Sequence, residues 1–252
     1  MNEYDIKDLV LAGVQWEITD IPYAVRAKWA TAAKDSPTTN NLPNKGASVV
    51  PPIAPSGSVS LEIAESMASR PSDIDTLIRM IGEFNHPLRA AVTQVVFPNI
   101  AKKPNGLVIV TDVPSTDDDA SGVVLSGAAG ELTDKMLAAI GMNREMVSIV
   151  PILFWRTPGG RTPSEQELSL ARPFVTRILE FLRPSVILTF GSTPAQEIAS
   201  VKLPSAHGSI VRTAIGVPVM PIYHPNYLLL KPSAKRDAWT ALQELQKLLK
   251  NQ

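Results

Sequence analysis

Short apolar runs and longer amphipathic segments alternate along the chain from residue 72 onward. The runs are four to ten residues long and mostly unbroken, which is typical of strands buried on both faces. We expect four strands, at residues 106–114, 146–155, 184–191 and 216–225.

The segments between these runs carry apolar residues at helical spacing and have recognisable start signals. We expect helices at residues 72–84, 127–142, 164–182, 192–200 and 233–250. Ser72 is the expected cap of the first. Ser164 and Glu167 have the spacing of a capping box at the start of the third.

The alternation predicts an α/β fold in which right-handed crossovers build a parallel sheet covered by helices on both faces. Ligands bind such sheets at the carboxyl ends of the strands. The four strands are followed by the loops "TDVPSTDDD", "WRTPGGRTP", "GSTP" and "YHPNYLLL". A site made from these loops is therefore expected.

A change in composition divides the chain before this regular region. Residues 34–59 are rich in Pro, Ser, Asn and Gly, which is typical of a linker. Residues 1–33 hold two short amphipathic pieces that we expect to dock as a helical segment on the main body, because they are too short to fold alone. Residues 60–252 are expected to form the main α/β/α domain.

The composition excludes several classes of site. The 252 residues contain 24 Lys and Arg and 24 Asp and Glu, so total charge gives no sign of a polyanion partner. With no cysteine, disulfides and thiolate metal sites are excluded, and three scattered histidines disfavour zinc. An acidic start and short apolar runs predict a cytoplasmic protein without a membrane partner.

His224 is the most informative polar residue of the four loops. It follows the last strand, and Pro225 favours extended backbone before it, which suits a side chain turned out of the sheet into a loop. A solvated histidine is the alternative, and position alone leaves the two interpretations level.

Beyond these patterns, the stretches "NREMVSIVPILFWRTPGGRTP" and "GVPVMPIYHPNYLLLKPSAKRDAW" resemble the family-four uracil-DNA glycosylases. "HPNYLL" is similar to that family's H-P-A-Y-L-L signature, and the opening residues and linker look like bacterial members. The resemblance implies a three-layer α/β/α sandwich with a four-stranded parallel central sheet. It also implies base flipping and cleavage of the bond between uracil and deoxyribose.

The resemblance assigns two catalytic residues. His224 matches the residue that stabilises the negative charge on the departing base. Asp112, in "TDVPS" where the family has G-E-A-P-G, keeps a carboxylate that could orient the attacking water or stabilise the cationic sugar.

Three residues are expected in the base pocket, and two of them differ from the family's residues. Pro114 is kept, but Leu125 replaces the phenylalanine that stacks on uracil, and Pro151 replaces the asparagine that reads its edge. A pocket that has lost a polar partner for its substrate loses selectivity for it.

The family's four cluster-binding cysteines are missing as well. Two of them fall at Trp155 and Ala171, and the other pair lies near "FNHPLRAA". We therefore expect apolar packing in place of an iron–sulfur cluster, and no cofactor.

The remaining family positions concern DNA, and each has a simpler alternative. Leu228 to Leu230 and Tyr227 match a loop that wedges into the duplex, or they pack under the last helix. The other candidates match phosphate-binding positions or are ordinary surface residues: Arg156, Arg161, Gly191, Ser192, Asn226, Lys231, Lys235 and Arg236.

Three functions fit these residues. The first is a monomeric glycosylase, acting on DNA that contains uracil or another deaminated base. The second is a catalytically degenerate member that binds DNA or a nucleotide, supported by Pro151 and Leu125. The third is a small-molecule enzyme that shares only the scaffold.

Overall fold

The computed structural model describes residues 60–213 and 216–250. The expected docking segment 1–33 and the whole of the expected linker 34–59 lie outside these ranges. The described helices, with 3-10 helices marked η, are α3 (Leu61–Ser69), α4 (Ile74–Glu83), η1 (Pro87–Ala91), α5 (Thr116–Ser121), α6 (Gly127–Ala139), η2 (Pro158–Gly160), α7 (Glu165–Leu182), α8 (Ser192–Ala199), α9 (Pro225–Leu230), η3 (Pro232–Ala234) and α10 (Lys235–Lys250).

The sheet contains five strands rather than the four expected. They are β1 (Leu107–Thr111), β2 (Ser148–Pro151), β3 (Val186–Phe190), β4 (Val211–Arg212) and β5 (Pro218–Ile222), in the order β2-β1-β3-β5-β4. The four expected strands are parallel, and β4 pairs antiparallel with β5 at the edge. The sequence did not indicate β4 because two residues are too few for a pattern.

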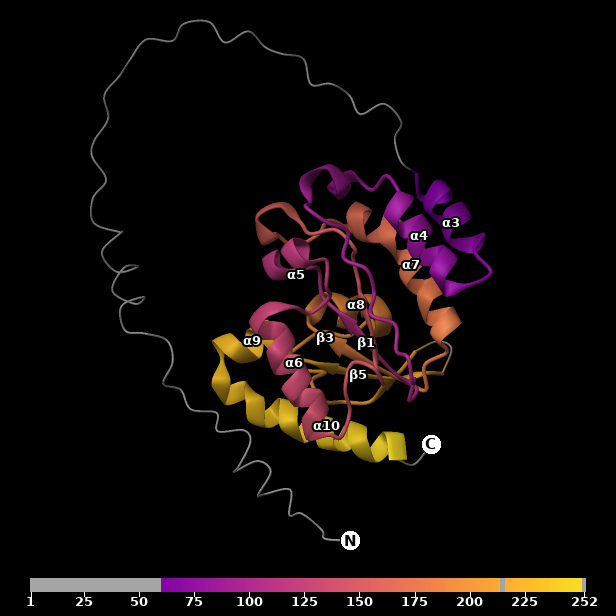
Figure 1. The fold of residues 1–252 in the computed structure, drawn as a ribbon. Helices are drawn as coiled ribbons and strands as arrows, with labels where there is room; N and C mark the ends of the chain where they lie inside the picture. The colour runs from indigo at the N-terminus through magenta and orange to yellow at the C-terminus, as the bar shows by residue number, and fades with distance from the viewer. Residues whose placement is uncertain (1–59, 214–215, 251–252) are drawn as a thin grey trace, which may run out of the picture. The chain divides into compact units, whose positions relative to one another are not determined.

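Alternate residues of the four parallel strands enter two different apolar cores, which makes the fold a three-layer sandwich. Leu107 and Ile109 of β1 pack on one side with residues of α6, α9 and α10. Val108 and Val110 pack on the other side with residues of α3, α4 and α7. Figure 1 shows these two groups of helices on opposite faces of the sheet. The predicted three-layer α/β/α fold is confirmed.

Most helix starts follow the predicted chemistry, with one correction. Ser164 and Glu167 form the capping box expected for α7. The cap of α4 is Asp73 instead of Ser72, because the Asp73 carboxylate accepts the Thr76 N–H at 2.8 Å. A carboxylate binds the free amides of a first turn at least as well as a hydroxyl.

Two short helices stand where loops were expected. The acidic stretch after β1 forms α5, which Ser115 and Asp118 begin with a capping box. The stretch after His224 forms α9, so His224 caps a helix instead of lying in a loop. No helix of the described residues is long and apolar enough to cross a bilayer.

Candidate active site

The four parallel strands end in register, so their carboxyl ends lie side by side along one end of the sheet. Thr111 pairs with both Pro151 and Phe190, and Phe190 pairs with Ile222. The residues that follow these positions therefore leave the sheet side by side. Asp112 comes directly after β1 and Gly191 directly after β3, while His224 lies two residues beyond β5.

A pocket of about 330 Å³ opens at this end of the sheet. Its lining residues are Asp112, Gly191, Ser192, Leu203, Pro204, Tyr223, His224 and Tyr227. The two expected catalytic residues thus share one pocket. Tyr223 directly precedes His224 but was not among the expected site residues. The Leu203–Pro204 wall was not indicated by the sequence, because it reaches the site only through the packing of a loop on β5.

His224 is held by its own helix. Its Nδ1 accepts the backbone N–H of Asn226 at 3.1 Å, which satisfies one free amide at the start of α9. A neutral imidazole that accepts at Nδ1 carries its proton on Nε2, which leaves Nε2–H as a hydrogen-bond donor. Burial lowers the pKa of His224 from 6.5, although Asp112 and Asp118 act in the opposite direction. The neutral donor form is therefore favoured at neutral pH.

Asp112 is fixed by the backbone and by a close neighbour. One carboxylate oxygen, Oδ1, accepts the Val113 N–H at 2.9 Å. The other, Oδ2, lies 2.7 Å from the place a Cβ would occupy at Gly191, whose φ of +104° also favours glycine. Gly191 therefore makes room for the carboxylate of Asp112.

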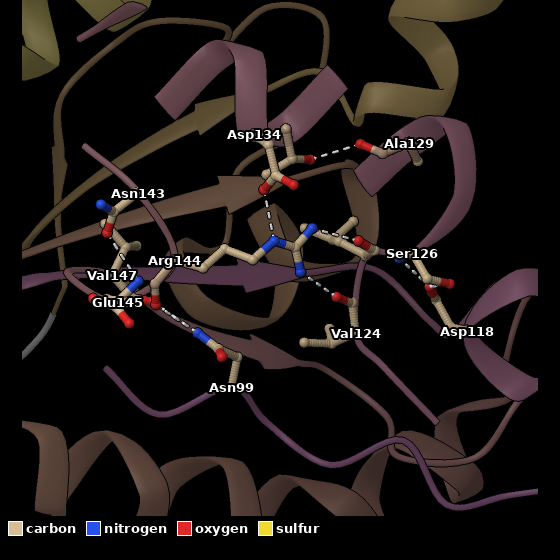
Figure 2. Close-up of polar contacts among 12 residues, drawn as sticks. Asn99, Asp118, Val124, Ser126, Ala129, Asp134, Asn143, Arg144, Glu145 and Val147 are labelled. Carbon is tan, nitrogen blue, oxygen red and sulfur yellow. Dashed lines mark hydrogen bonds and ion pairs between the residues drawn. The ribbon is translucent and has the colours of Figure 1, made fainter. Parts of the chain in front are cut away.

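Asp118 is a buried carboxylate near the site that sequence reasoning missed. It accepts the Ser115 N–H at 2.9 Å, and the N–H and hydroxyl of Ser126 at 2.6 and 2.8 Å. It thereby ties α5 to the start of α6, as Figure 2 shows for Ser126. The spacing of Ser115 and Asp118, which is that of a capping box, was the signal that could have identified it.

Leu125 lies in a tightly held turn between α5 and α6. Its φ of +51° is in the left-handed region, and its side chain is 2% exposed. Arg144 donates to the carbonyls of Val124 and Leu125 at 2.8 and 2.5 Å and pairs with Asp134 at 2.6 Å. Figure 2 shows the guanidinium between these partners. Arg144 was not predicted, because its partners are mainly backbone atoms far away in sequence.

The three residues assigned to the base pocket are not part of the lining described above. Pro114, Leu125 and Pro151 are all buried. Pro151 ends β2 beside Thr111 and has no side-chain hydrogen-bonding group to present. Their role in binding a base stays a prediction.

The expected wedge residues divide into buried and exposed ones. Leu228 is 1% exposed and belongs to the core, which favours the packing alternative for this residue. Tyr227 and Leu229 are 39% and 38% exposed, and Leu230 is 86% exposed at the end of α9. The exposed members are placed where they can meet a ligand next to the pocket.

The charged DNA candidates differ in how far they are already engaged. Arg161 forms a bidentate ion pair with Glu167, at 2.5 and 2.8 Å, and is thereby engaged with the first turn of α7. Arg156 is half-buried. A DNA contact by either arginine stays a prediction.

A basic group lies beside α9. Lys231 and Arg236 are exposed. Burial and the positive charge of Lys135 lower the pKa of Lys235. Lys135, in α6, is therefore close enough to Lys235 to belong to the same basic group. Asn226 and Ser192, expected near phosphates, are exposed at the starts of α9 and α8.

An aromatic cluster lies on the other side of the sheet, at the positions where the family resemblance places the missing cysteines. His86 stacks on Trp155 with ring centroids 4.3 Å apart, and Phe84 contacts both rings and Phe174. Ala171 is buried in the same core. Within residues 60–213 and 216–250 there is no group of three or more His, Asp or Glu that could hold a metal ion.

Comparison with known proteins identifies one family. The model of the uracil DNA glycosylase superfamily matches residues 97–246. A type-4 uracil-DNA glycosylase from Archaeoglobus fulgidus is 32% identical over 149 residues, which cover 56% of this chain and 75% of the relative. Type-4 uracil-DNA glycosylases from Thermotoga maritima and Pyrobaculum aerophilum are 30% and 28% identical, covering 49% and 52% of this chain and 66% and 72% of the relatives. Since most of these relatives are archaeal, the bacterial source stays a prediction.

These relatives correct the expectation of no cofactor. They are type-4 uracil-DNA glycosylases, the family whose resemblance implied four cluster-binding cysteines. The absence of cysteine from this chain therefore does not establish that the protein has no cofactor. The residues at the corresponding place do not fit such a cluster. Trp155, His86 and Phe84 fill the space with rings and offer no thiolate.

Proposed function

The chain belongs to the uracil-DNA glycosylase superfamily, and on that premise we propose that it hydrolyses the bond between deoxyribose and uracil, or another deaminated base, in DNA. The observation that carries the proposal is the shared pocket of Asp112 and His224 at the carboxyl ends of β1 and β5. A base must leave the duplex to reach such a pocket, so base flipping is part of the proposal. So are a monomeric state and a cytoplasmic location.

The proposed reaction uses each residue for one task. The C1′–N bond breaks, and its electron pair leaves with the base. Nε2–H of His224 donates to the base oxygen on which the negative charge develops. Asp112 stabilises the positive charge on the sugar and orients the water whose oxygen bonds to C1′. The proton of that water passes to the carboxylate or to solvent.

Three features of the chain support contact with DNA next to this pocket. Ser192 begins α8, where free backbone N–H groups can bind a phosphate. Lys231 and Arg236 offer positive charge beside α9. Leu230 presents an exposed apolar side chain that could fill the space of a flipped base.

The experiment that tests the proposal measures base release directly. Oligonucleotides with a single uracil, hypoxanthine or xanthine are incubated with the protein, and abasic sites are then cleaved and counted. We expect release of one of these bases, and a rate about 100- to 1000-fold lower for His224→Ala, as for the loss of an oxyanion donor. His224→Asn is the matched variant, because its side-chain oxygen can still accept the Asn226 N–H and begin α9. It should fold normally and remain slow.

A second function is favoured by one observation. Pro151 offers no group to read a base, and Leu125 offers no ring to stack on it. A protein that binds DNA without releasing any base would fit these two residues better. Salt-dependent binding together with no release of any of the three bases would replace our proposal with this one.

A further inference from the structure

The loop before β4 is fastened to the end of β5, next to His224. The Gly208 N–H donates to the Pro221 carbonyl at 2.8 Å. Directly after β5, the Tyr223 N–H donates to Nδ1 of His207 at 3.2 Å. The same loop supplies Leu203 and Pro204 to the pocket wall. His207 therefore connects one wall of the pocket to the residue that precedes His224.

Ring stacking strengthens this connection. The rings of His207 and Tyr223 are stacked, with centroids 4.0 Å apart and planes 16° apart. Tyr223 in turn contacts the ring of Tyr227 at 4.8 Å. These three rings form a column, and His224 lies between its last two members in the sequence. Two of the three, Tyr223 and Tyr227, also line the pocket.

The hydrogen bond defines the form of His207. Nδ1 can accept a hydrogen bond only while it carries no proton, so the imidazole that accepts the Tyr223 N–H is neutral. Protonation of His207 would break this bond. Burial lowers the pKa of His207 from 6.5, while the backbone and the carboxylate of Asp237 in α10 oppose the effect. The accepting form is thus favoured at neutral pH.

We propose that His207 is a positioning residue, which holds the Tyr223 backbone and ring so that the imidazole of His224 keeps its place in the pocket. His207 does not line the pocket itself, and so it acts through Tyr223. No sequence pattern indicated this role, since His207 lies in a loop without strand or helix periodicity. The expected effect of His207 on the rate of base release rests on the function proposed above. The expected effect of His207 on the position of the His224 imidazole does not.

Two matched variants separate the hydrogen bond from the stack. His207→Phe keeps an aromatic ring on Tyr223 but removes the acceptor. His207→Asn removes the ring but keeps an oxygen where Nδ1 was. Ser209→Ala, an exposed change in the same loop, is the control. The chain has only three histidines, so the ring C–H signals of His86, His207 and His224 can be assigned by single substitution and followed by NMR in the full chain.

We expect His207→Phe to shift the His224 signal and change its titration, and to lower the single-turnover rate of base release about three- to tenfold. The signal of His86, on the other side of the sheet, should not move, which a general loss of structure would not allow. His207→Asn, which keeps the acceptor but loses the stack, should shift the His224 signal less than His207→Phe does.

An unchanged His224 signal and titration in His207→Phe would overturn the inference. Movement of the His86 signal along with that of His224 would also overturn it, because it would indicate a global effect. If the wild-type protein releases no base, the proposed function fails, but the NMR comparison still decides whether His207 positions His224.

Discussion

The dipeptide His-Pro occurs twice in the chain with nearly the same backbone and opposite surroundings. His86 and His224 both cap a helix with φ near −62° and ψ of 142°, and both accept at Nδ1 the N–H two residues on. His86 is 1% exposed, stacked on Trp155, and uses Nε2 to reach the Glu167 carbonyl at 3.1 Å. His224 opens into a pocket with Asp112. Local sequence gives the cap, and tertiary surroundings give the role.

The state of His224 leads to a pH prediction. Base release should require the neutral imidazole, whose pKa is lowered below 6.5 by burial. The rate should therefore be constant near neutral pH and fall only as the pH drops below 6.5, through the lowered pKa, because protonation removes the Nδ1 acceptor that holds the ring. Single-turnover rates measured from about pH 5 to 8 check this.

The residual rate of His224→Asn should lack this acidic limb, since asparagine does not titrate. A wild-type rate that falls as the pH rises through 6.5 would contradict the prediction, because it would mean that the charged imidazole is the active form.

At the scale of elements, the start of α7 concentrates several interactions on one carboxylate. Glu167 pairs with Arg161 and accepts the Ser164 N–H at 2.7 Å, and these contacts lower its pKa from 4.5 to about 2. We expect Glu167→Gln to lower the free energy of unfolding by about 1 to 3 kcal/mol at neutral pH, as measured by urea unfolding.

The pH dependence of that loss has a definite sign. A lowered carboxyl pKa stabilises the fold above the unfolded value, so the difference between wild type and variant should persist down to pH 4.5 and shrink as the pH falls toward about 2. Glu165→Gln is the control in the same turn, where the side chain is 76% exposed and pairs with Arg172. It should cost less than about 0.5 kcal/mol. Equal losses in the two variants would argue against a special role for Glu167.

The elements that sequence could predict are those with a long enough pattern. The parallel strands and α4, α6, α7, α8 and α10 follow from apolar runs and helical spacing. The two-residue β4 and the six-residue α5 and α9 are set by tertiary pairing and by caps. The site divides in the same way. His224 follows from its place at a strand end and Asp112 from the family resemblance, whereas His207 and Arg144 bind backbone atoms that are distant in sequence.

At the scale of the whole molecule, a formal net charge of zero still allows basic side chains to gather locally. Lys231 and Arg236, with Lys135 and Lys235 close together, lie around the same end of the fold as the pocket. Attraction to a phosphate backbone is screened by salt, so binding to DNA should weaken steeply as the salt concentration rises.

We expect the double variant Lys231→Glu, Arg236→Glu to bind DNA more weakly and to reduce the salt slope of log K by about 1 to 2, which fluorescence anisotropy at several salt concentrations measures. Lys247→Glu makes the same kind of change at the far end of α10, where Lys247 pairs with Glu244 at 2.7 Å. It should leave the slope unchanged. An unaltered slope in the double variant would remove this surface from the DNA interface.

The closeness of Asp112 to Gly191 also constrains how this protein can evolve. A side chain at 191 and a carboxylate at 112 would occupy the same space, with only 2.7 Å between Oδ2 and the added carbon. A side chain at 191 would therefore displace the Asp112 carboxylate from its present position. Recovery of a carboxylate at 112 in its present position therefore requires that 191 still be glycine.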